Sequence, residues 1–159
     1  MKNTKAAFLW ILNILRKHKI PYQITGGFAA RIYGAKRKLA DIDIEIPEEK
    51  FDDIHDAIYK DVKKFIVFAP KRYKKEGFDV FLMTLKYKGQ LIDICGTRTD
   101  KLFDKKKKKM VKIPVDLKNY TKKLVFGKKV KVITKKELMA YKAKLRRRVD
   151  KIDIREINE

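Results

Sequence analysis

Residues 24–44 read ITGGFAARIYGAKRKLADIDI, and this stretch decides the fold that we expect. A short apolar strand ends at the pair Gly26-Gly27, and a small helix follows over 28–33. Glycines at such a place let backbone N–H groups approach a phosphate, because no Cβ is in the way. A basic loop then leads to a second strand over 42–46, in which acidic residues alternate with isoleucines. The stretch therefore predicts a strand, a phosphate-binding turn, a helix and a second strand in immediate succession.

The alternation in the second strand places two carboxylates on one face. Side chains of a strand point to opposite faces in turn, so Asp41 and Asp43 share one face. Ile42 and Ile44 then point into the core. Two carboxylates at this separation repel each other unless a cation lies between them. Oxygen ligands of this kind suit Mg²⁺, and a third carboxylate would complete a two-metal site that aligns the attacking and leaving oxygens about a phosphorus atom.

The third carboxylate has two candidates. Asp93 lies in the segment LIDIC (91–95), whose alternation is that of a half-buried strand, and this strand is a candidate neighbour of the first acidic strand. Asp79 is the competitor, but residues 80–83, which follow it, are apolar on both faces. The periodicity favours Asp93 and leaves Asp79 as the alternative.

The rest of the chain predicts helices and strands that alternate early and then cluster as strands. Asn3 or Thr4 caps the first helix, and a capping box from Thr134 to Glu137 opens the last one. The expected elements are helix 4–18, strand 22–25, helix 28–33, strand 42–46, helix 47–60, strand 65–68 stopped by Pro70, a hairpin of 78–87 with 90–95, a hairpin of 124–126 with 130–133, and a helix from 134 through Ile152. This order predicts an α+β fold, in which helices flank a mixed β-sheet and a hairpin and a helix form the C-terminal part.

Charge is the other strong signal. The 159 residues include 42 Lys plus Arg against 20 Asp plus Glu, for a net charge of +22. Residues 101–159 carry +15 of this charge, so we expect one minimal domain, 1–159, with a catalytic core at about 20–96 and a basic extension over about 97–159. Such a field favours a polyanionic partner such as RNA.

The single cysteine and the apolar runs bear on the compartment. Cys95 has no partner for an internal disulfide, which suits a reducing cytoplasm, and we expect it to be a small buried hydrophobic residue. The apolar runs are far too short to span a membrane. We therefore expect a cytoplasmic protein with no membrane partner, and the sequence is also compatible with a homo-oligomer.

The motifs resemble a known superfamily. Gly-Gly, then hydrophobic-Asp-hydrophobic-Asp, then a later hydrophobic-Asp-hydrophobic element is similar to the nucleotidyltransferases of the DNA polymerase β type. Residues 26–34 (GGFAARIYG), followed by Arg37 and DIDI, resemble the branch that holds tRNA nucleotidyltransferases, AbiEii-like toxins and the lincosamide and aminoglycoside nucleotidyltransferases. Residues 133–142 (ITKKELMAYK) resemble the helix that follows the catalytic sheet in the antibiotic-modifying and toxin branches.

The resemblance implies a role for each matching residue. Gly26 and Gly27 would hold the triphosphate of the nucleotide. Asp41 and Asp43 would bind two Mg²⁺ ions, with Mn²⁺ as a substitute. Asp93 would hold the catalytic metal and help to activate the acceptor hydroxyl as general base.

Two basic residues complete the implied nucleotide site. Arg37 lies four residues before the acidic pair, where the family often has a basic residue near the phosphates. Lys142 falls where a phosphate-contacting lysine would lie on the last helix, although an ordinary helix lysine is the simpler interpretation. Asp150 and Asp153 are expected to form ion pairs with Arg146 or Arg147.

The function implied is transfer of a nucleoside monophosphate from a nucleoside triphosphate, such as ATP, to an acceptor hydroxyl, with release of pyrophosphate. The net charge favours RNA as acceptor, with the 3′ end of tRNA as leading candidate. The candidate RNA contacts are Lys105, Lys106, Lys107, Lys108, Lys109, Arg146 and Arg147. The lysine run is expected to be a mobile loop.

Two alternatives to an RNA acceptor stay open. The first is a small lincosamide-like antibiotic, because a polycationic aminoglycoside would need an acidic cleft, which a chain of charge +22 supplies poorly. The second is a non-catalytic, basic RNA-binding protein on the same fold.

Overall fold

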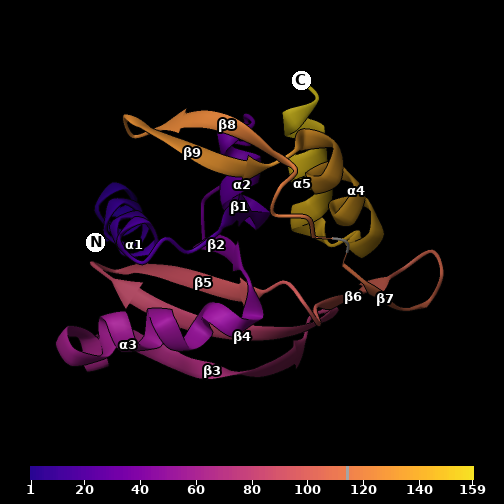
Figure 1. Cartoon of the computed structure of the whole chain (residues 1–159). Helices are drawn as coiled ribbons and strands as arrows, with labels where there is room; N and C mark the ends of the chain where they lie inside the picture. The colour runs from indigo at the N-terminus through magenta and orange to yellow at the C-terminus, as the bar shows by residue number, and fades with distance from the viewer. Residues whose placement is uncertain (114) are drawn as a thin grey trace.

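The computed structural model describes residues 1–113 and 115–159 (Figure 1). Its helices and strands, in chain order, are α1 (Thr4–Lys17), β1 (Gln23–Thr25), α2 (Gly26–Ile32), β2 (Asp41–Ile46), the 3₁₀ helix η1 (Glu48–Lys50), α3 (Phe51–Val62), η2 (Lys63–Phe65), β3 (Ile66–Lys75), β4 (Phe78–Tyr87), β5 (Gln90–Gly96), β6 (Lys101–Asp104), β7 (Lys109–Lys112), β8 (Tyr120–Val125), β9 (Lys128–Ile133), α4 (Lys135–Leu145) and α5 (Arg148–Ile157).

A single mixed sheet connects all nine strands of the described chain. Its order is β7-β6-β4-β5-β2-β1-β9-β8, and β3 pairs with β4 beside this path. β2 pairs with β5 in parallel and β1 with β9 in parallel, whereas the other pairs are antiparallel. The predicted α+β fold with a mixed sheet is confirmed.

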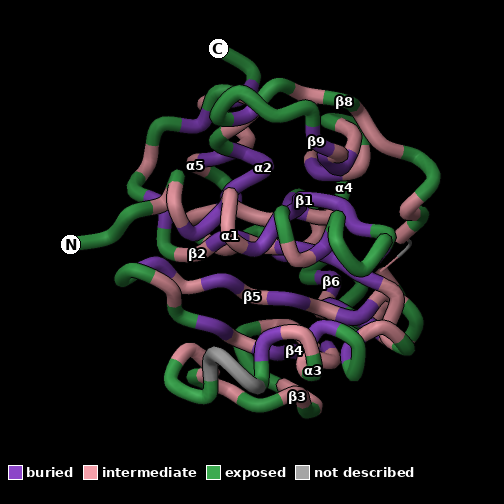
Figure 2. The backbone as a smooth tube through the Cα atoms, turned by 60° about the vertical axis from the view of Figure 1, so that its left-hand side comes forward, coloured by how far each residue is buried: buried purple, intermediate pink, exposed green. Residues whose placement is uncertain are grey.

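One face of the sheet forms the hydrophobic core with α1 and α3. Ile42 and Ile44 of β2 are buried in the same cluster as Phe8 of α1 and Ile54 of α3. Trp10 of α1 stacks on a tyrosine of β4 with the ring centroids 4.4 Å apart. Figure 2 shows that buried positions concentrate in the middle of the sheet, whereas β3 and β8 at its margins consist mainly of intermediate and exposed positions. The alternating isoleucines thus point into the core, as predicted.

The C-terminal part of the chain belongs to the same sheet. The hairpin β8–β9 turns at Phe126-Gly127 and joins the sheet through Ile24 of β1 and Val132 of β9. α4 and α5 lie together across the molecule from α3 (Figure 1). The predicted hairpins of β4 with β5 and of β8 with β9 are confirmed. The side-chain cap of α1 is also confirmed, because Asn3 accepts a 2.9 Å hydrogen bond from the backbone N–H of Ala6.

Three local predictions were wrong, and β3 is the first. The strand was expected to stop at Pro70, but it continues to Lys75. The pairing of β3 with β4 shifts register between Phe68 and Lys71, so Pro70 lies in a bulge. A proline is tolerated there because the bulge requires no ladder N–H from it.

The second correction concerns the last helix. We expected one helix from 134 through Ile152, whereas the structure has α4 and α5, separated at Arg146 and Arg147. Arg146 adopts the left-handed conformation, with φ 52° and ψ 32°, which ends α4. The apolar spacing alone did not predict this break, because α5 continues an apolar stripe of its own.

The third correction concerns the lysine run. Lys105 to Lys109 was expected to be a mobile loop; Lys105 to Lys108 form the exposed turn between β6 and β7, whereas Lys109 belongs to β7. Asp104 accepts hydrogen bonds from the backbone N–H groups of Lys106 and Lys107 at 2.9 and 3.0 Å. The backbone N–H of Lys105 also donates to the carbonyl of Lys144 at 3.0 Å, which ties the turn to α4.

The helices give no sign of a membrane span. Within residues 1–113 and 115–159, none is long and apolar enough to cross a lipid bilayer.

Two leucines of the sheet differ in burial, and we expect their substitution to affect stability differently. Leu85 of β4 is 0% exposed and Leu124 of β8 is 71% exposed. Leu85→Ala should lower the free energy of unfolding by about 2–5 kcal/mol, because it leaves a cavity in the core. Leu124→Ala should change it by less than about 0.5 kcal/mol. Urea denaturation followed by circular dichroism measures both, and equal effects of the two substitutions would contradict the described core.

Candidate active site

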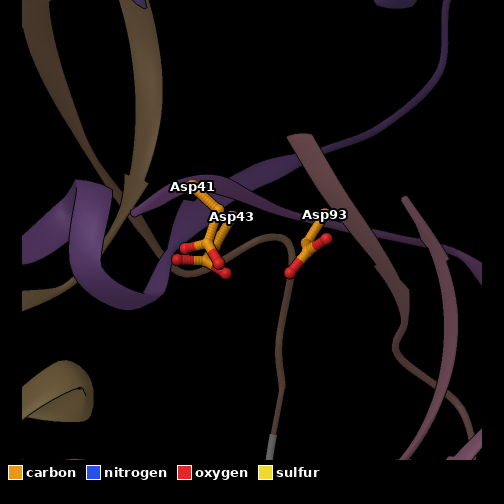
Figure 3. Close-up of side chains that lie close together, drawn as sticks. All are labelled: Asp41, Asp43 and Asp93. Atoms are coloured by element: carbon orange, nitrogen blue, oxygen red, sulfur yellow. The ribbon is translucent and has the colours of Figure 1, made fainter. Parts of the chain in front are cut away.

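Three carboxylates meet on the face of the sheet opposite the hydrophobic core. Because β2 and β5 pair in parallel, Asp43 stands beside Asp93 in register, and Asp41 lies on the same face as Asp43. One oxygen from each of the three residues lies within 4.8 Å of the others, and all three are partly exposed. Figure 3 shows the three side chains pointing toward a common point from the two neighbouring strands.

The competing carboxylate has another partner. Asp79 of β4 forms a 2.8 Å ion pair with Arg72 of β3. Asp93 instead accepts a 2.7 Å hydrogen bond from the hydroxyl of Thr84 in β4. The structure therefore places Asp93, and not Asp79, beside the predicted acidic pair.

The three carboxylates hold protons more tightly than usual. Burial, more than any other cause, raises the pKa of Asp93 to about 6. Burial also raises the pKa of Asp41, and burial together with the adjacent charges of Asp41 and Asp93 raises that of Asp43 well above its usual value. A bound cation would relieve this repulsion, because it favours the ionised form of all three.

The glycine pair lies directly against the acidic strand. Gly26 has φ +60°, a left-handed conformation that glycine adopts without strain, and a Cβ there would lie 2.1 Å from Oδ2 of Asp43. The backbone N–H of Gly27 donates a 3.0 Å hydrogen bond to that same oxygen. The turn thus holds Asp43 in place, in addition to its predicted role toward phosphate.

The structure brings both predicted basic residues to the site. Nη2 of Arg37 lies 2.7 Å from where a Cβ of Gly27 would be. Lys142 of α4 is 1% exposed, and its Nζ forms ion pairs with Asp153 at 2.9 Å and Asp150 at 3.2 Å. Lys142 is therefore a buried charge beside the site, and the simpler interpretation as an ordinary helix lysine is wrong.

The other predicted cations divide into two groups. Arg147 lines the site and pairs with Asp150, as expected, at 2.8 Å. Asp153, in contrast, pairs with Arg37 and Lys142 rather than with Arg146 or Arg147. Arg146 and the run Lys105 to Lys109 lie outside the cavity lining, and their role in binding RNA stays a prediction.

A cavity of about 530 Å³ opens between the acidic face of the sheet and α4–α5. Six acidic and four basic side chains line it, whereas basic residues outnumber acidic ones in the whole chain. Part of its wall is apolar and comes from β3, β4 and the segment before β8. These apolar residues are Phe68, Tyr73, Phe78, Val80, Leu82, Ile113 and Val115.

The sequence reasoning missed a second acidic pair. Glu45 follows Asp43 by one more step of the same alternation, lines the cavity and is 8% exposed. Asp100 is fully buried beside it, and burial raises its pKa to about 7. Burial, with the adjacent Asp100, also raises the pKa of Glu45 well above its usual value. Oε2 of Glu45 and Oδ2 of Asp100 are buried and have no hydrogen-bond partner among the described residues. The alternation of acidic and apolar residues in β2 could have indicated Glu45 as a site residue. The sequence around Asp100 contains no comparable pattern.

The donor set fits a divalent metal. Three carboxylate oxygens converge from two rigid strands, and hard oxygen ligands of this kind are those of Mg²⁺ or Mn²⁺. A cavity beside such a cluster can hold a phosphate-bearing substrate, because the cations of Arg37, Lys142 and Arg147 line the same space.

One known protein family matches most of the length of the chain. A sequence model of the aminoglycoside-2''-adenylyltransferase family matches residues 7–157. Among curated proteins, no sequence matches significantly.

Solved structures share the fold at low sequence identity. A candidate nucleotidyltransferase from Thermotoga maritima is 22% identical, with a TM-score of 0.64, over 86% of this chain and 83% of that one. The lincosamide antibiotic adenylyltransferase LnuA, bound to lincomycin, is 15% identical, with a TM-score of 0.65, over 100% and 99%. ANT(2'')-Ia in complex with adenylyl-2''-tobramycin is 15% identical, with a TM-score of 0.58, over 98% and 88%. These likenesses concern the fold.

The close approach at Gly26 gives a test of the site. Gly26→Ala should weaken binding of Mn²⁺ at least tenfold, because the new Cβ would displace the carboxylate of Asp43. Gly127→Ala is the matched control. Gly127 also has a positive φ, +79°, but no atom lies within 4 Å of where its Cβ would be. Both variants should lose about 1–2 kcal/mol to backbone strain, and only Gly26→Ala should lose metal affinity in calorimetric titration. Equal affinities would show that Gly26 does not shape the site.

The buried Asp100 predicts a pH dependence of stability. Its pKa is higher in the folded protein, about 7, than the usual 3.8, so the folded state retains the proton longer. Stability is therefore lost as pH rises from about 4 to 7. Asp100→Asn should remove this loss. The free energy of unfolding of the variant, measured by urea denaturation, should therefore rise relative to that of the wild type between pH 5 and pH 8. Asp56→Asn, at an exposed carboxyl, is the control. A difference between Asp100→Asn and the wild type that is the same at both pH values would contradict this.

Proposed function

The chain belongs to the aminoglycoside-2''-adenylyltransferase family and is a nucleotidyltransferase; on that premise we propose that it uses Mg²⁺ to transfer a nucleoside monophosphate from a nucleoside triphosphate to a hydroxyl of a small molecule. The observation that carries this proposal is the convergence of Asp41, Asp43 and Asp93 at the wall of a cavity of about 530 Å³.

The carboxylates would hold the metal and move one proton. Two Mg²⁺ ions bound to Asp41, Asp43 and Asp93 would neutralise charge on the phosphate and align the attacking and leaving oxygens. Asp93 would be the general base, because its carboxylate lies in the cluster and a bound cation would keep it ionised. It accepts the proton of the acceptor hydroxyl as that oxygen bonds to the α-phosphorus. The bond from the α-phosphorus to its bridging oxygen breaks, and pyrophosphate leaves.

The triphosphate would lie on the side of the cavity nearest the glycine turn. Gly26 and Gly27 leave room there because neither carries a Cβ, and Arg37 and Lys142 provide positive charge beside them. Charge-assisted hydrogen bonds from such groups are the usual means of binding phosphate oxygens.

The acceptor would lie against the apolar wall and Glu45. A cavity of about 530 Å³ is within the usual range for a small-molecule site. The net charge of +22 suggested that a cationic acceptor is disfavoured, but the lining of this cavity has more acidic than basic side chains. We therefore propose an acceptor that combines hydroxyls with an apolar part and a basic amine.

RNA, which the net charge favoured, is the weaker candidate. The family name and the names of the structural relatives, LnuA and ANT(2'')-Ia, point to small acceptors instead of tRNA. The basic surface outside the cavity explains a general attraction to polyanions without requiring an RNA substrate. A cytoplasmic location, where nucleoside triphosphates occur, remains part of the proposal.

A transfer assay with matched aspartate variants tests this function. The wild type, Mg²⁺ and each labelled triphosphate are incubated with lincosamides, with aminoglycosides and with total tRNA. Label should move to a small acceptor, and Asp93→Asn should lower the rate at least about 100-fold, because it removes a general base and a metal ligand. Asp79→Asn, whose carboxylate pairs with Arg72 away from the cluster, should keep most of the activity. Transfer to tRNA alone would overturn the proposed acceptor, and no transfer to any acceptor would overturn the proposed activity.

A further inference from the structure

We propose that two buried carboxylates of α5, Asp150 and Asp153, are positioning residues that hold Arg37, Lys142 and Arg147 toward the triphosphate, and that Arg147 is a further phosphate ligand. The proposal rests on the proposed nucleotidyl transfer and names how its nucleotide is held. The three cations come from separate parts of the chain, the loop before β2, α4 and the start of α5, yet all three line the same cavity as the acidic cluster.

Asp153 joins two of the cations. Its oxygens accept hydrogen bonds from Nε and Nη2 of Arg37 at 2.6 and 2.9 Å, a bidentate pair, and form an ion pair with Nζ of Lys142 at 2.9 Å. The carboxyl of Asp153 is 0% exposed, so these contacts form away from water. Arg37 is thereby fixed beside Gly27, at the turn where the triphosphate is expected.

Asp150 joins the third cation to the same group. It accepts hydrogen bonds from Nε and Nη2 of Arg147 at 2.8 and 3.1 Å and from Nζ of Lys142 at 3.2 Å. The guanidinium of Arg147 also lies over the ring of Phe78, with its carbon 5.0 Å from the ring centroid. A guanidinium has five N–H donors, and Asp150 uses two of them, so Arg147 keeps donors for a phosphate.

The break between α4 and α5 makes this arrangement feasible. In one continuous helix, Lys142 and Asp150 would be eight residues apart and separated by about 12 Å along the axis. The left-handed residue Arg146 ends α4, and the chain turns so that Asp150 and Asp153 reach the amine of Lys142. The break that the apolar pattern did not predict is therefore what brings the carboxylates to the cations.

The charge balance of the group favours an anionic ligand. Three cations share two carboxylates, which leaves one positive charge in excess within this group of five residues. Burial alone would lower the pKa of Lys142, but Tyr141 and the two carboxylates more than offset it, so the amine stays charged. Buried ion pairs add little net stability compared with apolar residues of equal volume. Stability alone is thus a weak reason for five charged groups beside this cavity, and phosphate binding supplies a stronger one.

The test compares ATP with adenosine, because only ATP offers phosphates to the three cations. Calorimetric titration in Mg²⁺ is carried out on the wild type, Asp153→Asn, Asp153→Glu and Arg147→Gln, with Asp56→Asn at an exposed site of α3 as matched control. Asp153→Asn and Arg147→Gln should each weaken ATP at least tenfold and leave adenosine within twofold. Asp153→Glu should recover part of the ATP affinity. In the transfer assay, Asp153→Asn should raise KM for the nucleotide more than it lowers kcat.

The outcomes separate this inference from the proposed function. A wild type that binds no nucleoside triphosphate would overturn both. A wild type that binds ATP, with variants that bind it equally well, would overturn only the role of α5. Equal losses for ATP and adenosine would show that the network is merely structural, which also overturns it. If Asp153→Asn does not fold, Arg147→Gln decides, because its side chain is 32% exposed and Asp150 retains Lys142 as a partner.

Discussion

The parallel pairing of β2 with β5 is the constraint on which the rest of the site depends. It sets Asp43 beside Asp93 and brings Asp41 to the same face, so that three carboxylates share a small space. The same pairing buries the isoleucines of both strands on the other face, and one register therefore serves the core and the acidic cluster together. Burial raises the pKa of all three carboxylates, and the charges of neighbouring carboxylates raise those of Asp43 and Asp93 further.

The parts of the fold that the sequence predicted are those governed by local periodicity. Alternation in DIDIEI and LIDIC predicted strands with one buried face. The same alternation favoured Asp93 over Asp79 as the third carboxylate of the cluster. Capping residues at Asn3 and Thr134 marked the starts of two helices that the structure contains. These signals are reliable here because each depends on neighbours only a few residues away.

The parts that were missed depend on contacts far apart in the chain. Asp150 and Asp153 form ion pairs with Lys142 and Arg37 beside the turn at Arg146. The local sequence pattern does not indicate these ion pairs. The turn of the lysine run is tied to α4 by the backbone N–H of Lys105, which donates to the distant carbonyl of Lys144. Net charge is a poor guide to the acceptor for a related reason: it averages over the whole chain, whereas a substrate meets only the side chains that line one cavity.

A crystal grown with Mn²⁺ and a non-hydrolysable nucleoside triphosphate analogue tests the central claim most directly. The claim is that Asp41, Asp43 and Asp93 form a divalent-metal centre that receives the phosphates of a nucleotide. Anomalous scattering should place Mn²⁺ between these three carboxylates, with the triphosphate running from the metal toward Gly26 and Gly27. Manganese bound elsewhere, or a nucleotide bound with no metal at the three carboxylates, would contradict the account.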